Sequence, residues 1–370
     1  MQPLHGVKVL DFSTLLPGPL CTLMLAEAGA DVIKLERPGA GDEMRTYEPK
    51  LDVDSVNFAL LNRGKKSVCV DLKSDTARQK ILDLVREADV LVEQFRPGVM
   101  QRLGLDYASL SAVNPGLIYC SITAYGQTGP KALTAAHDLN FQAETGMLAL
   151  TCDASGAPTL PPTLTGDLAG GTYPAMVNIL LALRQRDLNG GKGQHLDISM
   201  TDNLFTLMYW GLGNGWAAKQ WPTPGSDLVT GGTPRYAIYR TQDDQYLAAA
   251  PLEDKFWSNF LTLLDAPELL QETDDAVIRS TVAGLIARHP VAHWLKRFEN
   301  QDVCTVRVVS LQEAVRDPHF VERGLFDRTV TEAGGTRMPA LPMPISPAFR
   351  APETDQRTPA LGEHTQAILG

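Results

Sequence analysis

The chain has 370 residues, of which 44% are hydrophobic and 21% charged, and its formal net charge is −10. This length predicts two domains or one large one, and the composition is that of a globular protein and not of a disordered one. The net negative charge argues against a nucleic-acid partner, because binding a phosphate backbone requires a basic face. A small anionic ligand needs only a local basic pocket and stays compatible with this charge.

The N-terminus and the cysteines indicate a cytoplasmic protein. The opening run MQPLHGVKVLDF lacks the basic segment, apolar run and cleavage site of a secretory signal. No stretch reaches about 18 uninterrupted apolar residues, so no membrane span or membrane partner is expected. The cysteines are odd in number and none stands in a C-x-x-C pair, which is typical of reduced thiols and not of a disulfide framework or a zinc site.

The first half of the chain alternates short apolar runs with helical patterns. The apolar runs predict strands at residues 7–12, 31–35, 67–71, 90–92 and 117–123. The segments between them predict helices at residues 20–28, 76–87 and 107–113. Because strands that alternate with helices form parallel sheets covered on both faces, this half is predicted to be an α/β domain.

The second half has a different organisation. Its pattern predicts, in order, a helix at 167–184, a strand at 194–198, a helix at 201–219, a turn-rich stretch at 220–234, strands at 235–240 and 246–250, helices from Glu253, Asp275 and Val291, and a strand-like tail from Phe326. The predicted domains are a large one at 1–200 completed by 326–370, a linker helix and loop at 201–234, and a small α+β domain at 235–325.

The first predicted turn lacks a nucleotide-binding signature, whereas later strand ends carry basic residues. Gly18 stands alone between two prolines, where a pyrophosphate cradle would need G-x-G-x-x-G. Arg37 follows the second predicted strand, and ligands of open α/β sheets bind at that edge. Other basic residues near strand ends are Arg63, Lys65, Lys66, Lys73, Arg96 and Arg102. Each alone is ordinarily a solvated charge, but several at one edge would form a phosphate pocket.

A series of short motifs follows in order along the chain. The motifs are LAEAGADVIKLERPG at 25–39, NRGKKSV at 62–68, VDLK at 70–73, FRPG at 95–98, RLG at 102–104, YGQTGP at 125–130, GKGQ at 191–194 and LGEHT at 361–365. Each motif is weak alone, but their order spans nearly the whole chain and makes the series specific. Taken together, the motifs resemble those of the family III CoA transferases (CaiB/BaiF), and most of all those of their α-methylacyl-CoA racemase branch.

The resemblance implies a fold, a partner and a binding site. Members have a Rossmann-like large domain with a parallel sheet and a smaller α+β domain, and two chains interlock into a homodimer. The substrate is an acyl-CoA thioester, and no cofactor is implied beyond the coenzyme A that it carries; metals, flavin and nicotinamide have no motif here. The matched motifs assign CoA binding to Arg37, Val70, Asp71, Leu72, Lys73, Gln94, Phe95, Arg96 and Arg102, and they put Ala136, Asp138, Leu139, Asn140 and Phe141 beside the thioester.

Asp167 and His137 carry the chemistry that the resemblance implies. Asp167, in TGDLAGG at 165–171, matches the aspartate that both branches use, although an aspartate before an apolar helical run is also a common N-cap. His137, in AHDLNF at 136–141, resembles the catalytic base of the racemases, and the transferases generally lack it. An isolated histidine in such a run would more often be structural.

Racemisation needs two proton carriers, one on each face of a planar enolate. Histidine, with a reference pKa of about 6.5, exchanges a proton near neutral pH, whereas aspartate, at about 3.9, must be raised by burial to act as an acid. The predicted enzyme is therefore an isomerase, a 2-methylacyl-CoA racemase that uses His137 and Asp167. The rival is a CoA transferase in which Asp167 is the nucleophile. A CoA-binding scaffold with a dead site is disfavoured, because both acid–base residues are present.

Two further positions complete the comparison with the racemases. Glu253, in PLEDKFW at 251–257, matches a glutamate that partners the catalytic histidine, and the small domain of the other chain would have to deliver it. Its alternative role is that of an acid favoured at a helix N-terminus by the helix dipole. Phe141 replaces a tyrosine often found in racemases, a departure that bears on the substrate more than on the reaction.

Overall fold

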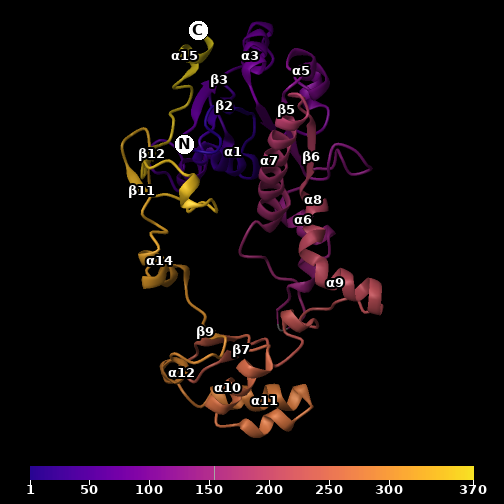
Figure 1. Cartoon of the computed structure of the whole chain (residues 1–370), viewed down its shortest axis with the longest axis vertical. Coiled ribbons are helices and arrows are strands. Elements are labelled where there is room, and N and C mark those ends of the chain that lie inside the picture. The colour runs from indigo at the N-terminus through magenta and orange to yellow at the C-terminus, as the bar shows by residue number, and fades with distance from the viewer. Residues whose placement is uncertain (154) are drawn as a thin grey trace. The chain divides into compact units, whose positions relative to one another are not determined.

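The computed structural model describes residues 1–153 and 155–370, and its chain forms two compact units. The first unit comprises Met1–Met147, Leu160–Leu207 and His319–Gly370, and the second comprises Leu148–Thr159 and Met208–Pro318. Figure 1 shows the elements of both units along the chain.

A six-stranded parallel sheet forms the centre of the first unit, which confirms the predicted α/β fold. Its order is β3-β2-β1-β4-β5-β6. The strands are β1 (Lys8–Asp11), β2 (Asp31–Glu36), β3 (Lys66–Cys69), β4 (Val90–Glu93), β5 (Ile118–Thr123) and β6 (His195–Ser199). The chain runs outward from β1 to β3 and then returns to place β4 on the other side of β1. Open sheets of this kind bind ligands outside the carboxyl ends of their strands, where the strand order reverses.

Helices cover both faces of this sheet. Successive residues of a strand point to opposite faces, so each strand contributes apolar side chains to a core on either side. Val9 and Val90 pack into one core cluster with α1 (Pro17–Glu27) and α7 (Tyr173–Leu188). Their neighbours Leu10 and Leu91 pack into another with α3 (Asp75–Glu87) and α5 (Tyr107–Val113). The remaining helices of this unit are α2 (Val56–Asn62), α4 (Val99–Arg102), α6 (Asp138–Glu144) and α8 (Met200–Leu204).

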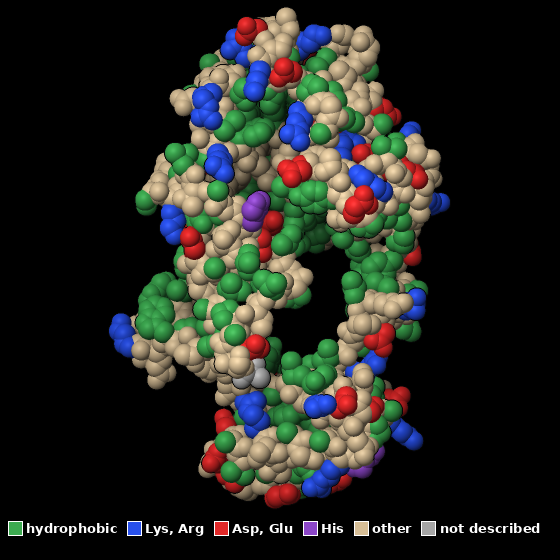
Figure 2. Space-filling view, turned by 180° about the vertical axis from the view of Figure 1, so that it is seen from behind, with side chains coloured by type: hydrophobic (Ala, Val, Ile, Leu, Met, Phe, Trp, Pro, Cys, Tyr) green, Lys and Arg blue, Asp and Glu red, His purple; other side chains and the backbone are tan. Residues whose placement is uncertain are grey.

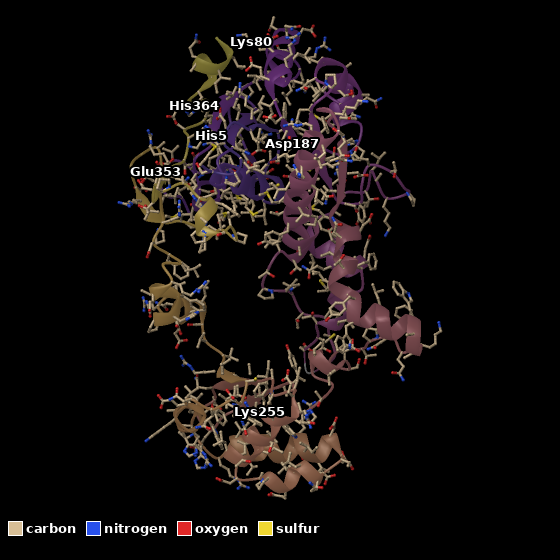
Figure 3. The ribbon with its side chains drawn as sticks, in the orientation of Figure 1. His5, Lys80, Asp187, Lys255, Glu353 and His364 are labelled. Atoms are coloured by element: carbon tan, nitrogen blue, oxygen red, sulfur yellow. The ribbon has the colours of Figure 1, made fainter. Side chains whose placement is uncertain are left out.

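The C-terminal tail belongs to the first unit. Its strands β10 (Thr329–Thr331), β11 (Arg337–Pro339) and β12 (Asp355–Arg357) form a small sheet, and α15 (Thr365–Leu369) lies beside β3. The tail is fixed by His364, whose Nδ1 accepts a hydrogen bond from Ser67 N at 3.3 Å, and by Gly370, whose carbonyl accepts one from Lys80 Nζ at 2.8 Å; Figure 3 labels His364 and Lys80.

The second unit is a small α+β structure with a core of its own. Its antiparallel sheet has the order β7-β8-β9, and its core includes Trp257, Phe260 and Trp294. Its elements are α9 (Tyr209–Gly213), β7 (Ala237–Arg240), β8 (Tyr246–Ala249), α10 (Asp254–Leu263), α11 (Asp275–Ile286), α12 (Val291–Phe298), β9 (Thr305–Arg307) and α13 (Leu311–Ala314), and α14 (Pro318–Glu322) follows at the passage into the first unit.

Two predicted helices differ from the structure in form. The single helix expected at 201–219 is wrong, because the chain there forms α8, a 3₁₀ turn at Phe205–Met208, α9 and a π-helical turn at Asn214–Ala218. Three glycines interrupt this run and weaken a continuous helix, and Pro222 and Trp221 pack against Gly211 and Gly215. The helix expected from Asp167 begins instead as a π-helical segment, Gly166–Thr172, and continues as α7.

No helix among the described residues is both long and apolar enough to span a bilayer. On the face drawn in Figure 2, acidic and basic side chains are interspersed and do not gather into one basic patch.

Candidate active site

A cavity of about 630 Å³ lies at the carboxyl ends of β1, β2 and β3 and reaches the loop after β4. Seven of the residues predicted to bind CoA line it, namely Arg37, Val70, Asp71, Leu72, Lys73, Phe95 and Arg102. Phe12, Leu35 and Leu103 add apolar surface. The cavity therefore joins an apolar wall, which suits a purine, to the cations Arg37, Lys73 and Arg102, which suit phosphates.

A buried charge network supports the edge of this cavity. Lys34 Nζ lies 2.9 Å from Asp42 Oδ2 and donates to Ser13 O at 2.8 Å, and both side chains of that ion pair are fully buried. Lys65 Nζ lies 3.1 Å from Asp11 Oδ2. Burial lowers the pKa of Lys65 to about 8, and Lys65 and Lys34 together hold the pKa of Asp11 well below its usual range despite the opposing effect of burial. Ser13 and Asp42 themselves line the cavity.

Three of the basic residues considered for a phosphate pocket are committed to ion pairs elsewhere. Arg63 is buried and its guanidinium lies 2.9 Å from Glu27 Oε1. Lys65 pairs with Asp11, and Lys66 pairs with Asp31 at 2.7 Å. The segment at 62–68 therefore stabilises the fold through ion pairs. The basic residues that line the large cavity are Arg37, Lys73 and Arg102.

A second cavity of about 360 Å³ brings together the two predicted catalytic residues. His137 and Asp167 both line it, with the further predicted residues Gln94, Phe95, Arg96, Ala136, Asn140 and Phe141. Thr14 and Phe95 line both this cavity and the larger one, so the two cavities adjoin. A single ligand with a phosphorylated nucleotide and a thioester end could occupy both.

Asp167 lies in the π-helical segment Gly166–Thr172, which packs closely against α6 and α8. Its backbone N–H donates to Asp138 Oδ1 at 3.0 Å. Glycines let the π-helical segment approach its neighbours, because a Cβ on Gly170 would lie 2.2 Å from the carbonyl oxygen of Met200 and one on Gly166 would lie 2.9 Å from Phe141. Burial raises the pKa of Asp167 to about 7, and the nearby Asp138 carboxylate adds to the shift. This is the direction that an acid role requires.

His137 presents its imidazole to the cavity from the position just before α6. Its backbone N–H donates to Asn140 Oδ1 at 3.0 Å, and its carbonyl accepts from Asn140 N at 2.8 Å. These bonds fix the backbone of His137 at the start of the helix and leave the ring for other partners. The side chain is exposed in the single chain.

Three predicted residues lie elsewhere. Asp138 is buried behind the cavity wall, where Oδ1 accepts from Asp167 N and Oδ2 accepts from Gln142 Nε2 at 2.6 Å. Leu139 is 40% exposed and is not among the described residues that line either cavity. Glu253 is exposed and lies just before α10 in the second unit. Its pairing with His137 stays a prediction.

Glu93, the last residue of β4, was not among the predicted site residues. Its side chain is buried, and burial raises its pKa to about 7. The only signal in the sequence was an acid at the end of an apolar strand, immediately before the Gln94–Arg96 segment. Because acids at strand ends are usually solvated, this signal was too weak to use.

A family model and several known proteins match this chain over nearly its whole length. The model of CoA-transferase family III matches residues 4–365. The human alpha-methylacyl-CoA racemase is 32% identical over 375 residues, which are 99% of this chain and 92% of that protein. The acetyl-CoA:oxalate CoA-transferase of Acetobacter aceti is also 32% identical, over 99% of this chain and 95% of that protein.

Solved structures show the same fold. A CaiB/BaiF family protein from Brucella suis superposes with a TM-score of 0.85 at 31% identity, over 99% of this chain and 98% of that one. Rv3272 from Mycobacterium tuberculosis gives a TM-score of 0.85 at 29% identity, over 100% and 99%. From the family model, these relatives and the parallel sheet, we conclude that this chain is an enzyme of CoA-transferase family III.

Proposed function

We propose that this enzyme is a 2-methylacyl-CoA racemase that moves a proton at the carbon α to the thioester. The observation that carries the proposal is the meeting of His137 and Asp167 in one cavity, where the carboxyl has a pKa of about 7. At neutral pH this carboxyl exists in both its acid and its base form. It can therefore serve as a proton donor as well as an acceptor.

In the proposed reaction, the imidazole of His137 takes the α-proton and the C–H electron pair moves into the thioester, which becomes a planar enolate. The protonated carboxyl of Asp167 then returns a proton to the opposite face of that carbon, and the thioester carbonyl re-forms. The reverse direction exchanges the two roles. No group leaves the substrate. Proton exchange with solvent then returns His137 to its neutral form and Asp167 to its acid form before the next turnover in the same direction.

The adjoining cavity would hold the coenzyme A portion of the substrate. Arg37, Lys73 and Arg102 supply positive charge for the phosphates, and Phe12, Leu35 and Leu103 supply apolar surface for the adenine. Phe95 lies at the junction of the two cavities, where the pantetheine arm would pass. The proposed reaction uses no other cofactor. Among residues 1–153 and 155–370, no three His, Cys, Asp or Glu side chains gather so as to hold a metal ion.

A CoA transferase is the second candidate, because relatives such as the mouse succinyl-CoA:glutarate CoA-transferase, 31% identical over 100% of this chain, have that activity in their names. In that reaction the Asp167 carboxylate would attack an acyl-CoA, and coenzyme A would pass to a second acid. Such an attack needs an ionised aspartate, whereas burial here favours the neutral form. His137 would have no part in it.

We further propose a homodimer in which the partner chain supplies Glu253 to His137. Its support is an exposed apolar stripe along α7, formed by Tyr173, Val177, Leu180, Leu181 and Leu188, which are 40–69% exposed in the single chain. A stripe of this kind is typical of a surface that another protein covers. A carboxylate from the partner would orient the imidazole and stabilise its protonated form.

Two assays distinguish the candidate reactions. Hydroxylamine trapping of an acyl group on Asp167, together with CoA transfer to an added free acid, would support the transferase. For the racemase, a chiral 2-methylacyl-CoA incubated in heavy water must gain deuterium at the α-carbon and lose its optical purity. Replacing His137 with alanine should leave a transferase nearly unaffected.

A further inference from the structure

A third cavity, of about 400 Å³, lies beside the carboxyl end of β4, the middle of β5 and the first residue of β6. Its polar lining includes Glu93, Ser121, Gln127 and His195, and it shares Arg96 and Pro97 with the cavity that holds His137 and Asp167. We propose that Glu93, in its protonated form, is a positioning residue that holds the loop after β4 in the shape that binds coenzyme A. This inference rests on the CoA site proposed above.

The position of Glu93 connects the sheet to that loop. Glu93 is 3% exposed, and its Oε2 accepts a hydrogen bond from Phe95 N at 2.7 Å. The next residue, Gln94, reaches across to α1, where its Oε1 accepts from Gly18 N at 2.8 Å. Phe95 lies at the junction of the two ligand cavities. A change at the Glu93 carboxyl therefore acts directly on the backbone that carries the proposed ligand contacts.

A chain of polar side chains leads from Glu93 to the surface. Glu93 is paired with Ser121 across β4 and β5, and donation from the Ser121 hydroxyl lowers the pKa of the Glu93 carboxyl. Ser121 Oγ lies 2.9 Å from His195 Nε2, and the ring of His195 stacks on Tyr107. Burial lowers the pKa of His195, so its neutral form is favoured. Ser121 can therefore donate either to the ionised Glu93 carboxylate or to the neutral His195 ring, and these side chains carry no positive charge that would pair with that carboxylate.

Burial and the Asp197 carboxylate oppose the ionised form of Glu93. Burial is the main reason that its pKa is raised to about 7, and the Asp197 carboxylate on β6 adds to the shift, while donation from Ser121 and from Phe95 N opposes it. Asp106, Arg96, Tyr107, Tyr119 and His195 also line the cavity. Among the described residues no lysine or arginine forms an ion pair with Glu93. Above neutral pH the carboxylate is therefore a buried, unpaired charge, which a shift of the loop would relieve by admitting water.

The test is the binding of coenzyme A itself to the full-length protein and to Glu93→Gln between pH 5.5 and 9. Glutamine keeps the shape, an acceptor for Phe95 N and a donor for Ser121, but it cannot ionise. If only the protonated form is competent, the Kd of the unmodified protein should rise about tenfold between pH 6 and pH 8 relative to the variant, and the two should agree at pH 6. The ratio of the two Kd values is the readout, because the phosphates of coenzyme A titrate in the same range.

Two further variants give shifts of opposite sign that a merely structural role would not produce. Ser121→Ala removes a donor to the carboxylate and should move the midpoint of the Kd change to higher pH. Asp197→Asn removes a like charge and should move it to lower pH. Circular dichroism checks that each variant is folded, and in the Glu93→Gln background neither change should affect the pH dependence.

The outcomes separate this inference from the proposed function. A Kd ratio that stays constant with pH, or midpoints that do not move in Ser121→Ala and Asp197→Asn, overturns the role of Glu93 and leaves the CoA site intact. If the unmodified protein binds no coenzyme A at any pH, the proposed CoA site is wrong, and the role of Glu93 in binding is wrong with it.

Discussion

At the scale of single residues, the proposed chemistry depends on an exposed imidazole, His137, and on the Asp167 carboxyl, whose pKa burial raises to about 7. The motifs singled out His137 and Asp167, and the structure places both at one cavity. In contrast, Arg63 and Lys65 resembled pocket cations in the sequence and prove to be buried partners of Glu27 and Asp11. Their partners are distant in sequence, so no local pattern could reveal those pairs. The raised pKa of Glu93 likewise depends on burial that the sequence does not show.

Asp167→Asn should have opposite effects on activity and on stability. Loss of a proton carrier should lower kcat by about 10²–10⁴-fold. In the folded protein Asp167 keeps its proton up to about pH 7, whereas in the unfolded chain it loses the proton near pH 4. The unfolded chain therefore binds fewer protons between these pH values, and the free energy of unfolding falls as pH rises from about 4 to 7. The variant should therefore be more stable than the unmodified protein at pH 8 and nearly equal to it at pH 4, as thermal melts can show. A variant that is less stable at pH 8 would contradict the assigned pKa.

His137→Ala should abolish α-proton exchange from at least one enantiomer of a 2-methylacyl-CoA, because one face of the enolate loses its proton carrier. Deuterium incorporation measured separately for each enantiomer checks this. His5→Ala is the matched control, since His5, labelled in Figure 3, is exposed and is not among the described residues lining either ligand cavity. If His5→Ala loses as much α-proton exchange as His137→Ala, the proposed role of His137 is wrong.

At the scale of elements, regular segments were predictable and irregular ones were not. The strands of the parallel sheet follow apolar runs bounded by turn residues, and these runs were visible in the sequence. The π-helical segment at Gly166–Thr172 was read as the start of an ordinary helix, because its form depends on glycines packing against Met200 and Phe141. π-helical turns often occur at functional sites, and this one carries Asp167.

Gly170→Ala should damage both stability and activity. The added Cβ would lie 2.2 Å from the backbone oxygen of Met200, which cannot rotate away. Overpacking of this kind typically costs about 1–3 kcal/mol, and the displaced segment carries Asp167, so kcat should fall as well. Urea unfolding and steady-state kinetics measure the two effects. Gly284→Ala in α11 is the control, because nothing lies within 4 Å of its added Cβ, and it should leave kcat unchanged and stability equal or slightly higher.

At the scale of the whole molecule, alternation of strands and helices predicted the parallel sheet, and the order of strands explains where the cavities lie. The return of the chain to β4 beside β1 creates the reversal at whose carboxyl edge both ligand cavities open. Assembly is harder to derive, because periodicity within one chain does not specify a partner. The exposed stripe on α7 and the exposed Glu253 support a shared active site, which remains a prediction.

Co-expression of His137→Ala chains with Glu253→Gln chains tests that shared site. If His137 and Glu253 of one site come from different chains, a mixed dimer keeps one complete site, and the co-expressed mixture should recover about a quarter of the unmodified activity, whereas each variant alone is impaired. Differently tagged chains allow the mixed dimer to be purified. If both residues came from the same chain, the mixed dimer would show no recovery.

The central claim, that the enzyme moves a proton and not a group, is tested most directly by incubating it with a single enantiomer of a 2-methylacyl-CoA in heavy water. The account predicts deuterium at the α-carbon, loss of optical purity and an intact thioester, all dependent on His137 and Asp167. Retention of configuration without deuterium, together with transfer of coenzyme A to an added carboxylic acid, would contradict it.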